Sequence, residues 1–254
     1  MLFYRSKHEE TEYARRSLQV KPYEDRKPLI EEEDGKIHAE VRGFPEIERE
    51  ASRCGYGGSQ YWFRNKWSRL AGCASVSATN LIAFHGFGTQ PDSMDGDIPV
   101  YEEEHYIELQ NRMFGYMRPG MRGFPYIEVY EQKFLEYAST CGLQLNSEIY
   151  RGWKQAEDAF RYVQTAINEN NPMAMLILTH RAAEIEEDTW HWMTITGYET
   201  AGEEALDGDR LGRVLISNYG KRQWMRASVL FEAVPGNDVK LILFRQKKTV
   251  RKEP

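Results

Sequence analysis

Three side chains that together support nucleophilic catalysis occur along the chain in the order Cys73, His191, Asn218. A cysteine becomes a nucleophile when its pKa is lowered, and a helix N-terminus and a nearby imidazolium both lower it. Cys73 stands at the start of a run of small and then larger apolar residues that predicts a helix beginning at about residue 72 or 73 and ending near residues 85–86. Its sulfur would face the free N–H groups of the first turn. Taken alone, Cys73 fits a buried core cysteine equally well, and that is the commoner role of a lone cysteine.

His191 is the candidate general base. It opens an apolar run, residues 191–197, that predicts a strand, and tryptophans flank it on both sides. A histidine held at a strand start in apolar surroundings suits proton transfer, although a hydrogen-bonded structural histidine has the same local pattern. His180, just after an earlier predicted strand, is a weaker alternative. His85 is excluded because it lies 12 residues further along the predicted helix, about 18 Å from Cys73.

Asn218 ends the next apolar run and is the candidate for orienting the imidazole. The intervening segment, residues 199–213, is acidic and contains three glycines, so it predicts a hairpin loop. The end of the second strand would then lie beside the start of the first. An amide at that place fixes the tautomer of the His191 imidazole without adding charge. A turn-forming asparagine at a strand end is the alternative interpretation.

The elements that must position these residues indicate an α+β fold. Apolar residues at helical spacing predict helices, and short apolar runs later in the chain predict strands. The helices are expected from about 72–73 to near 85–86 and at about 101–114, 126–142 and 154–168, and the strands at 173–178, 191–197, 214–217 and 239–244. Helices followed by strands favour an antiparallel sheet over alternating βαβ units. We therefore expect a helical part with the cysteine to pack on an antiparallel sheet with the histidine and asparagine.

Residues 1–50 differ from the rest of the chain because they are rich in charge and poor in large aliphatic side chains. We expect them to form an arm or strap that adds little to the core, and we place the main domain at 51–254. A partly disordered arm and an inhibitory leader are alternatives. The glycines of segment 54–59 predict a flexible loop.

The sequence around the three residues resembles that of the papain-like cysteine peptidases, in particular the bacterial branch related to bacteriocin-processing peptidases. The similar segments are Gly72-Cys73 before a helix of small residues, His191 before an apolar strand ending in Gly197-Tyr198, and Leu215-Ile216-Ser217-Asn218-Tyr219-Gly220. The resemblance covers residues from about 55 to 245. It implies a papain-like fold and a thioester route to peptide or amide hydrolysis, and deamidases, isopeptidases and acyltransferases use the same set of residues.

The resemblance also implies a glutamine upstream of the nucleophile, whose amide joins the cysteine N–H in an oxyanion hole. Gln60 is the candidate, with Asn65 as a weaker alternative. Gln60 lies 13 residues before Cys73, farther than is usual in the papain group. This spacing favours the alternative function, a catalytically inactive papain-like scaffold that binds a partner. For substrate binding we expect contributions from Gly72, which leaves room for a substrate backbone, and from the aromatic residues Trp190, Trp192 and Tyr219.

Composition excludes several other classes of protein. The net charge of −6 gives nucleic-acid phosphates no obvious electrostatic partner, so we expect no nucleic acid. A peptide or protein substrate is what the resemblance implies. No apolar run is long enough to span a bilayer, and the first 30 residues lack the apolar core of a secretory signal. We therefore expect no membrane partner and a cytoplasmic protein. Three cysteines at unrelated spacings fit reduced thiols.

Metal and cofactor chemistry has little support in the sequence. The acidic runs at 102–105 and 184–188 are typical of solvated faces rather than of metal sites. Neither a dinucleotide-binding motif nor a phosphate loop occurs, so we expect no metal and no cofactor. Cys54 and Cys141 are excluded as nucleophiles because neither is expected at a helix N-terminus.

Overall fold

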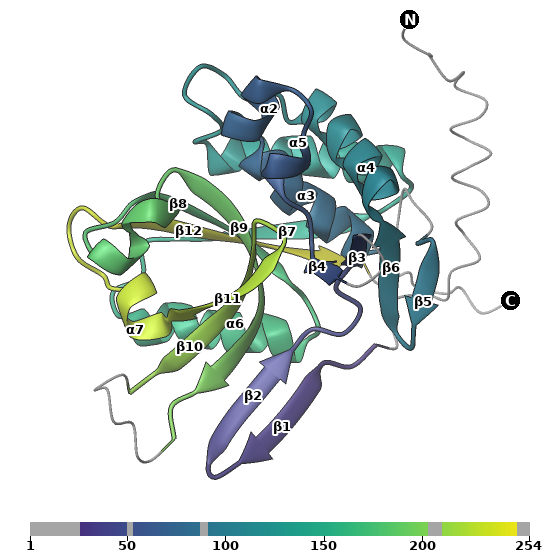
Figure 1. Ribbon diagram of the computed structural model, residues 1–254. Helices are drawn as coiled ribbons and strands as arrows, with labels where there is room; N and C mark the ends of the chain where they lie inside the picture. Colours follow the sequence, from purple (N-terminus) through teal and green to yellow (C-terminus); the bar gives the residue numbers. More distant parts are fainter. Residues whose placement is uncertain (1–25, 50–52, 87–90, 203–209, 248–254) are drawn as a thin grey trace, which may run out of the picture.

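The computed structural model describes residues 26–49, 53–86, 91–202 and 210–247, and its main feature is a large antiparallel sheet with helices on both faces (Figure 1). The strands of this sheet are β1 (Leu29–Glu33), β2 (Lys36–Glu40), β7 (Leu145–Tyr150), β8 (Met173–Thr179), β9 (His191–Thr200), β10 (Gly212–Asn218), β11 (Lys221–Arg226) and β12 (Asp238–Gln246). Their order is β1-β2-β9-β8-β12-β7, and β10 pairs with both β9 and β11. The predicted α+β class with an antiparallel sheet is confirmed.

A smaller sheet and the helices complete the fold. The smaller sheet has the order β4-β3-β6-β5, and only its β3–β6 pairing is parallel. Its strands are β3 (Glu46–Arg49), β4 (Arg53–Tyr56), β5 (Ser93–Asp95) and β6 (Ile98–Glu102). The helices are α2 (Lys66–Ala71), α3 (Cys73–Phe84), α4 (Glu103–Tyr116), α5 (Ile127–Thr140), α6 (Ala156–Asn168) and α7 (Ala227–Leu230), with 3-10 turns η2 (Gln60–Trp62) and η3 (Ala183–Asp188). The four predicted helices correspond to α3 to α6, and the four predicted strands to β8, β9, β10 and β12. No helix in the described part of the chain is long and apolar enough to cross a membrane.

The central strands of the large sheet, β8, β9, β10 and β12, are mostly buried on both faces, which explains their continuous apolar runs. Along β8, Met173, Met175 and Ile177 contribute to the core shared with α6 and α7. The alternate residues Ala174 and Leu176 contribute to the core shared with α3, α4 and α5. Because successive side chains of a strand point to opposite faces, a strand covered on both sides has no polar alternation.

The N-terminal segment contributes more to the core than its composition predicted. β2 pairs with β9 in the large sheet, and β3 pairs with β4 and β6 in the small one. Ala39 and Phe44 are buried in one core and Ile47 in the other. The expectation that this segment adds little core is therefore wrong for residues 26–49. The expected boundary at residue 50 lies outside the described residues, between the paired strands β3 and β4.

Helix α3 is buried along its whole length, and one polar side chain joins it to its surroundings. The Asn80 Nδ2 group donates to Thr194 Oγ1 of β9 and to Ser217 Oγ of β10, both at 3.3 Å. Asn80 Oδ1 accepts from the Gly58 N–H at 2.8 Å and from the Tyr106 hydroxyl at 2.9 Å. Buried polar groups that are satisfied in this way specify one arrangement of the elements around them.

The glycine segment 54–59 is not the flexible loop that the sequence predicted. Its first residues belong to β4, and residues 55–59 are buried. Gly57 has φ +68°, and a Cβ there would lie 2.5 Å from Ser217 Oγ and 2.9 Å from Asn80 Nδ2. Close packing against α3 and β10, rather than flexibility, is the reason for glycine at this position.

The substitution Gly57→Ala tests this packing, with Gly86→Ala as its control. Both glycines have positive φ, but a Cβ on Gly86 meets nothing within 4 Å. Both substitutions place alanine in the strained left-handed conformation at a cost of about 1–2 kcal/mol. Gly57→Ala loses a further ~1–3 kcal/mol because the new methyl group displaces the Asn80 network. Urea unfolding of the two variants measures the difference, and equal losses would show that the segment is loosely packed.

Candidate active site

Cys73 is the first residue of α3, as its sequence context predicted. Gly72 precedes it as the N-cap, so the sulfur lies at the positive end of the helix dipole. The backbone N–H groups of Ala74 and Trp192 lie close enough to the sulfur to lower the pKa of the Cys73 thiol. The side chain is buried, with 8% of its surface exposed. A thiolate here has donors both from its own helix and from strand β9.

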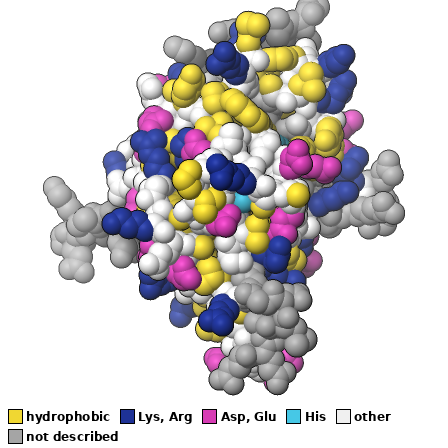
Figure 2. All heavy atoms as spheres, turned by 90° about the vertical axis from the view of Figure 1, so that its left-hand side faces the viewer, with side chains coloured by type: hydrophobic (Ala, Val, Ile, Leu, Met, Phe, Trp, Pro, Cys, Tyr) yellow, Lys and Arg dark blue, Asp and Glu magenta, His cyan; other side chains and the backbone are white. Residues whose placement is uncertain are grey.

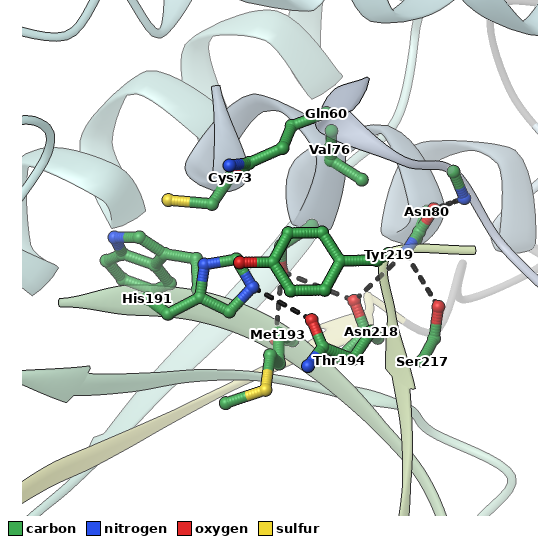
Figure 3. A pocket seen from close by; sticks show the side chains of 13 residues that line it. Gln60, Cys73, Val76, Asn80, His191, Met193, Thr194, Ser217, Asn218 and Tyr219 are labelled. Atoms are coloured by element: carbon green, nitrogen blue, oxygen red, sulfur yellow. Dashed lines mark hydrogen bonds between the residues drawn. The ribbon is translucent and has the colours of Figure 1, made fainter. Parts of the chain in front are cut away.

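His191 and Asn218 meet through the β9–β10 hairpin. The register pairs Ser217 with Thr194, which places Asn218 beyond the last pair and beside the start of β9. Nε2 of His191 donates to Oδ1 of Asn218 at 2.8 Å. The imidazole lies between Asn218 and Cys73, with its second ring nitrogen on the side of the sulfur (Figure 3). The structure thus brings the three predicted residues into one pocket.

The thiol and the imidazole shift each other's pKa in opposite directions. Burial raises the pKa of Cys73, but the hydrogen bond and charge of His191 and the two backbone N–H groups outweigh it, so the pKa lies below its ordinary value. Burial lowers the pKa of His191, but the bond and charge of Cys73 and the bond to Asn218 raise it above its ordinary value. Both shifts favour the thiolate–imidazolium form of the pair over the neutral form.

Tyr219 covers the imidazole. Its ring stacks on that of His191 with the centroids 4.7 Å apart, and on the other side it stacks on Tyr61 at 4.8 Å. Tyr219 has φ +50° and Gly220 has φ +74°, so the chain turns sharply into β11 and the ring is carried back over the histidine. The pocket beside the thiol is small, about 10 Å³, which is space for about one water molecule.

Gln60 lies in the same pocket as Cys73 despite the long spacing between them. The intervening residues form η2 and α2, which loop out and return the chain to the start of α3. Nε2 of Gln60 donates to the Arg69 carbonyl of α2 at 2.9 Å, and its second hydrogen remains for another acceptor. Figure 3 shows this side chain reaching toward Cys73. Asn65, the weaker alternative, is instead the exposed N-cap of α2.

Two residues expected to contact substrate have additional structural roles. A Cβ on Gly72 would lie 2.4 Å from the Ser68 carbonyl and 2.6 Å from the Phe63 ring. Glycine is therefore required there for packing, and Gly72 does not line the described pockets at Cys73. Trp192 stacks on Tyr130 at 4.0 Å, so most of this side chain belongs to the core, although it also lines both pockets.

A second, larger pocket begins at the thiol on the side away from Tyr219. Its volume is about 230 Å³. Hydrophobic side chains gather in the upper half of the face in Figure 2, at the height of α2 and the loop before α5. Residues of this pocket that remain exposed include Trp67, Leu70, Met121 and Trp190, of which Trp190 is 57% exposed. We refer to this pocket as the apolar cleft.

The remaining sequence candidates lie elsewhere. His180 accepts a hydrogen bond from the Ala182 N–H and does not line the pocket of Cys73. Cys141 ends α5, and the Cys54 side chain lies outside the described residues. No group of three potential metal-binding side chains occurs among the described residues.

Sequence reasoning missed two residues behind the triad. Asp188 and Gln223 both accept hydrogen bonds from Nδ2 of Asn218, each at 2.8 Å. Asp188 belongs to the run 184–188, which the sequence indicated to be a solvated face, and it is 7% exposed. The prediction of a solvated face is therefore wrong for Asp188. Gln223 faces the site because a two-residue turn follows Asn218, and the Tyr219-Gly220 pair was the available signal for that hairpin.

Comparison with known proteins adds no family assignment, because the chain matches no known family profile and no curated protein.

Alkylation of Cys73 tests the predicted thiolate, with Cys141 as the internal comparison. A thiol with a lowered pKa reacts with iodoacetamide at lower pH, so Cys73 is expected to be modified faster than Cys141 at pH about 6. In the variant His191→Ala, the reaction of Cys73 shifts to higher pH because the stabilising imidazolium is absent. Peptide mass spectrometry after timed labelling measures both rates. Equal pH profiles for Cys73 in the two proteins would contradict the pairing.

Proposed function

We propose that this protein is a papain-like thiol hydrolase that cleaves a peptide or amide bond through a covalent thioester. The observation that carries the proposal is that Cys73, His191 and Asn218 line one pocket at the contact of a buried helix with an antiparallel sheet, where His191 is hydrogen-bonded to Asn218 and lowers the pKa of Cys73. Its chain order and its setting are those expected from the resemblance. Pairing of a low-pKa thiol with a high-pKa imidazole is the condition for nucleophilic catalysis by cysteine.

In the proposed first step, the Cys73 thiolate attacks the carbonyl carbon of the substrate. The carbonyl oxygen becomes an oxyanion, for which the Cys73 N–H and Nε2 of Gln60 are the candidate donors. The His191 imidazolium then gives its proton to the leaving amine as the C–N bond breaks. A thioester on Cys73 and a neutral imidazole remain.

In the second step, the neutral His191 imidazole removes a proton from water, and the resulting hydroxide attacks the thioester carbonyl. The C–S bond breaks, the carboxylic acid product leaves, and thiolate and imidazolium are restored. Asn218 holds the ring in one orientation throughout because its Oδ1 accepts from Nε2 in both states. An amine in place of water would give acyl transfer on the same residues.

The apolar cleft indicates the kind of substrate. It adjoins Cys73, is lined by Leu70, Phe124, Leu178 and Trp190, and contains one basic residue, Arg122. Exposed apolar side chains around a hollow are typical of a binding surface. We propose that a bulky apolar side chain of the substrate occupies it, next to the bond that is cleaved.

Binding without catalysis is the second candidate function. The observation that favours it is the narrow space beside the thiol, about 10 Å³, under the stacked rings of Tyr219 and Tyr61. In this case, the apolar cleft binds a peptide that is never cleaved.

Incubation with a library of peptides and amides in H₂¹⁸O separates the two functions. The hydrolase is expected to place one ¹⁸O atom in a new carboxylate, as measured by mass spectrometry. Cys73→Ala lowers the rate by at least about 10³-fold because no thioester forms, whereas Cys141→Ala has no effect. Peptide binding with no ¹⁸O product in the unmodified protein would support the scaffold function.

Leu70→Glu tests the apolar cleft, with Val129→Glu as its control. Both are exposed aliphatic residues, 66% and 40% exposed, but only Leu70 lines the cleft. A charge in the cleft disfavours an apolar side chain, so kcat/KM for substrates with Leu or Phe near the cleaved bond falls about 10- to 100-fold. Val129→Glu leaves kcat/KM unchanged. A loss that is equal for apolar and polar substrates would exclude the cleft as the specificity site.

A further inference from the structure

Asp188 is a buried carboxylate that the proposed steps do not use. It is the last residue of η3, and it is 7% exposed, whereas Glu186 and Glu187 on the same turn are exposed. Another acidic residue of η3, Glu184, pairs with Arg226. Asp188 forms no ion pair with Lys or Arg among the described residues. An ionised carboxylate is costly to bury unless hydrogen bonds and a nearby positive charge compensate it.

The hydrogen bonds of Asp188 form a closed set with two amides. Oδ1 of Asp188 accepts from Nδ2 of Asn218 at 2.8 Å, and its Oδ2 accepts from Nε2 of Gln223 at 3.1 Å. Nδ2 of Asn218 uses its second hydrogen on Oε1 of Gln223 at 2.8 Å. Both hydrogens of the Asn218 side-chain amide are therefore donated to acceptors on the side away from His191.

This set determines which end of Asn218 faces the histidine. An ionised carboxylate can only accept hydrogen bonds, so Asp188 requires the nitrogen of the Asn218 amide on its side. The amide oxygen must then face His191, where it accepts from Nε2. A proton held on Nε2 leaves Nδ1 of the neutral ring free to take the proton of the thiol.

We propose that Asp188 is a positioning residue of this site: through Asn218 it fixes the Nε2–H tautomer of His191, and its negative charge stabilises the imidazolium. This inference rests on the proposed function and adds Asp188 to the site formed by Cys73, His191 and Asn218. Asp188 does not touch the reacting atoms. Asp188 affects the Cys73 sulfur only through the Asn218 amide and the His191 ring.

The charges around His191 agree with this role. The titratable groups that face it are Cys73 on α3, Asp188 on η3 and Tyr219 after β10, with Tyr61 stacked behind Tyr219. Burial raises the pKa of Tyr219 well above its usual range, so this phenol stays neutral. Against the lowering effect of burial, the charge of Asp188 acts together with Cys73 and Asn218 to raise the pKa of His191. Removal of the Asp188 charge must therefore lower the pKa of His191.

The test is an NMR titration of His191 in the Cys73→Ala protein, which needs no catalytic activity. Asp188→Asn keeps the size of the side chain and removes the charge, and the matched control Glu187→Gln removes an exposed charge from the same turn. We expect Asp188→Asn to lower the pKa of His191 by about one unit. Glu187→Gln is expected to change it little, because that charge is screened by solvent. Equal shifts in the two variants would overturn the proposal.

The ¹⁵N shifts of the neutral ring provide a second measurement that keeps Asp188 intact and so does not depend on the folding of a variant. We expect the proton of His191 on Nε2 in the Cys73→Ala protein. A proton found on Nδ1 would overturn the proposal whether or not the protein is a hydrolase.

If a substrate is cleaved, a kinetic test is also available. Asp188→Asn is expected to lower kcat more than it raises KM. It should also move the basic limb of the kcat–pH profile to lower pH, because His191 loses its proton at lower pH. Asp188→Glu restores that limb in part.

Discussion

The structure depends on one interaction, the contact of a buried thiol with a buried imidazole. Little water reaches either group, and burial disfavours both ionised forms, the Cys73 thiolate and the His191 imidazolium. The surrounding groups must replace the lost hydration. Three kinds of group can do so: the backbone N–H groups near the Cys73 sulfur, the Asn218 amide at the His191 ring, and the Asp188 carboxylate behind that amide. They come from different elements of the fold.

Such a contact requires that α3 and the β9–β10 hairpin stay in register. A relative displacement of these two elements would move the sulfur away from the ring, and close packing of the core opposes such a displacement. Asn80 resists the displacement, since its single amide bonds to both strands, to the glycine segment and to α4. The site and the structural core are therefore one network: Ser217, which bonds Asn80, directly precedes Asn218 in β10.

The two sides of the thiol differ in character. On one side, the stacked rings of Tyr61 and Tyr219 shield the His191–Asn218 bond from solvent, which strengthens a hydrogen bond that water would otherwise compete for. On the other side, the apolar cleft is open and wide. In the proposed reaction, this asymmetry would hold the substrate mainly on one side of the bond that is cleaved. The exposed apolar residues of the cleft come from α2, the loop before α5 and the residue before β9.

The sequence by itself determined the local structure and the reactive residues. The spacing and size of apolar residues predicted α3 to α6 and the four main strands. Burial of one or both faces of an element imposes a pattern of apolar residues that is visible within a short segment of sequence. The same pattern placed Cys73, His191 and Asn218 at element ends. Tertiary structure alone decided what lies behind and around them. Asp188 was predicted to be solvated because its acidic neighbours are. The residues of η2 and α2 return the chain so that Gln60 lies near Cys73, and β2 and β3 join the sheets by pairing with β9 and β6, which lie farther along the chain. Those contacts are non-local, so no pattern within a short segment of sequence encodes them.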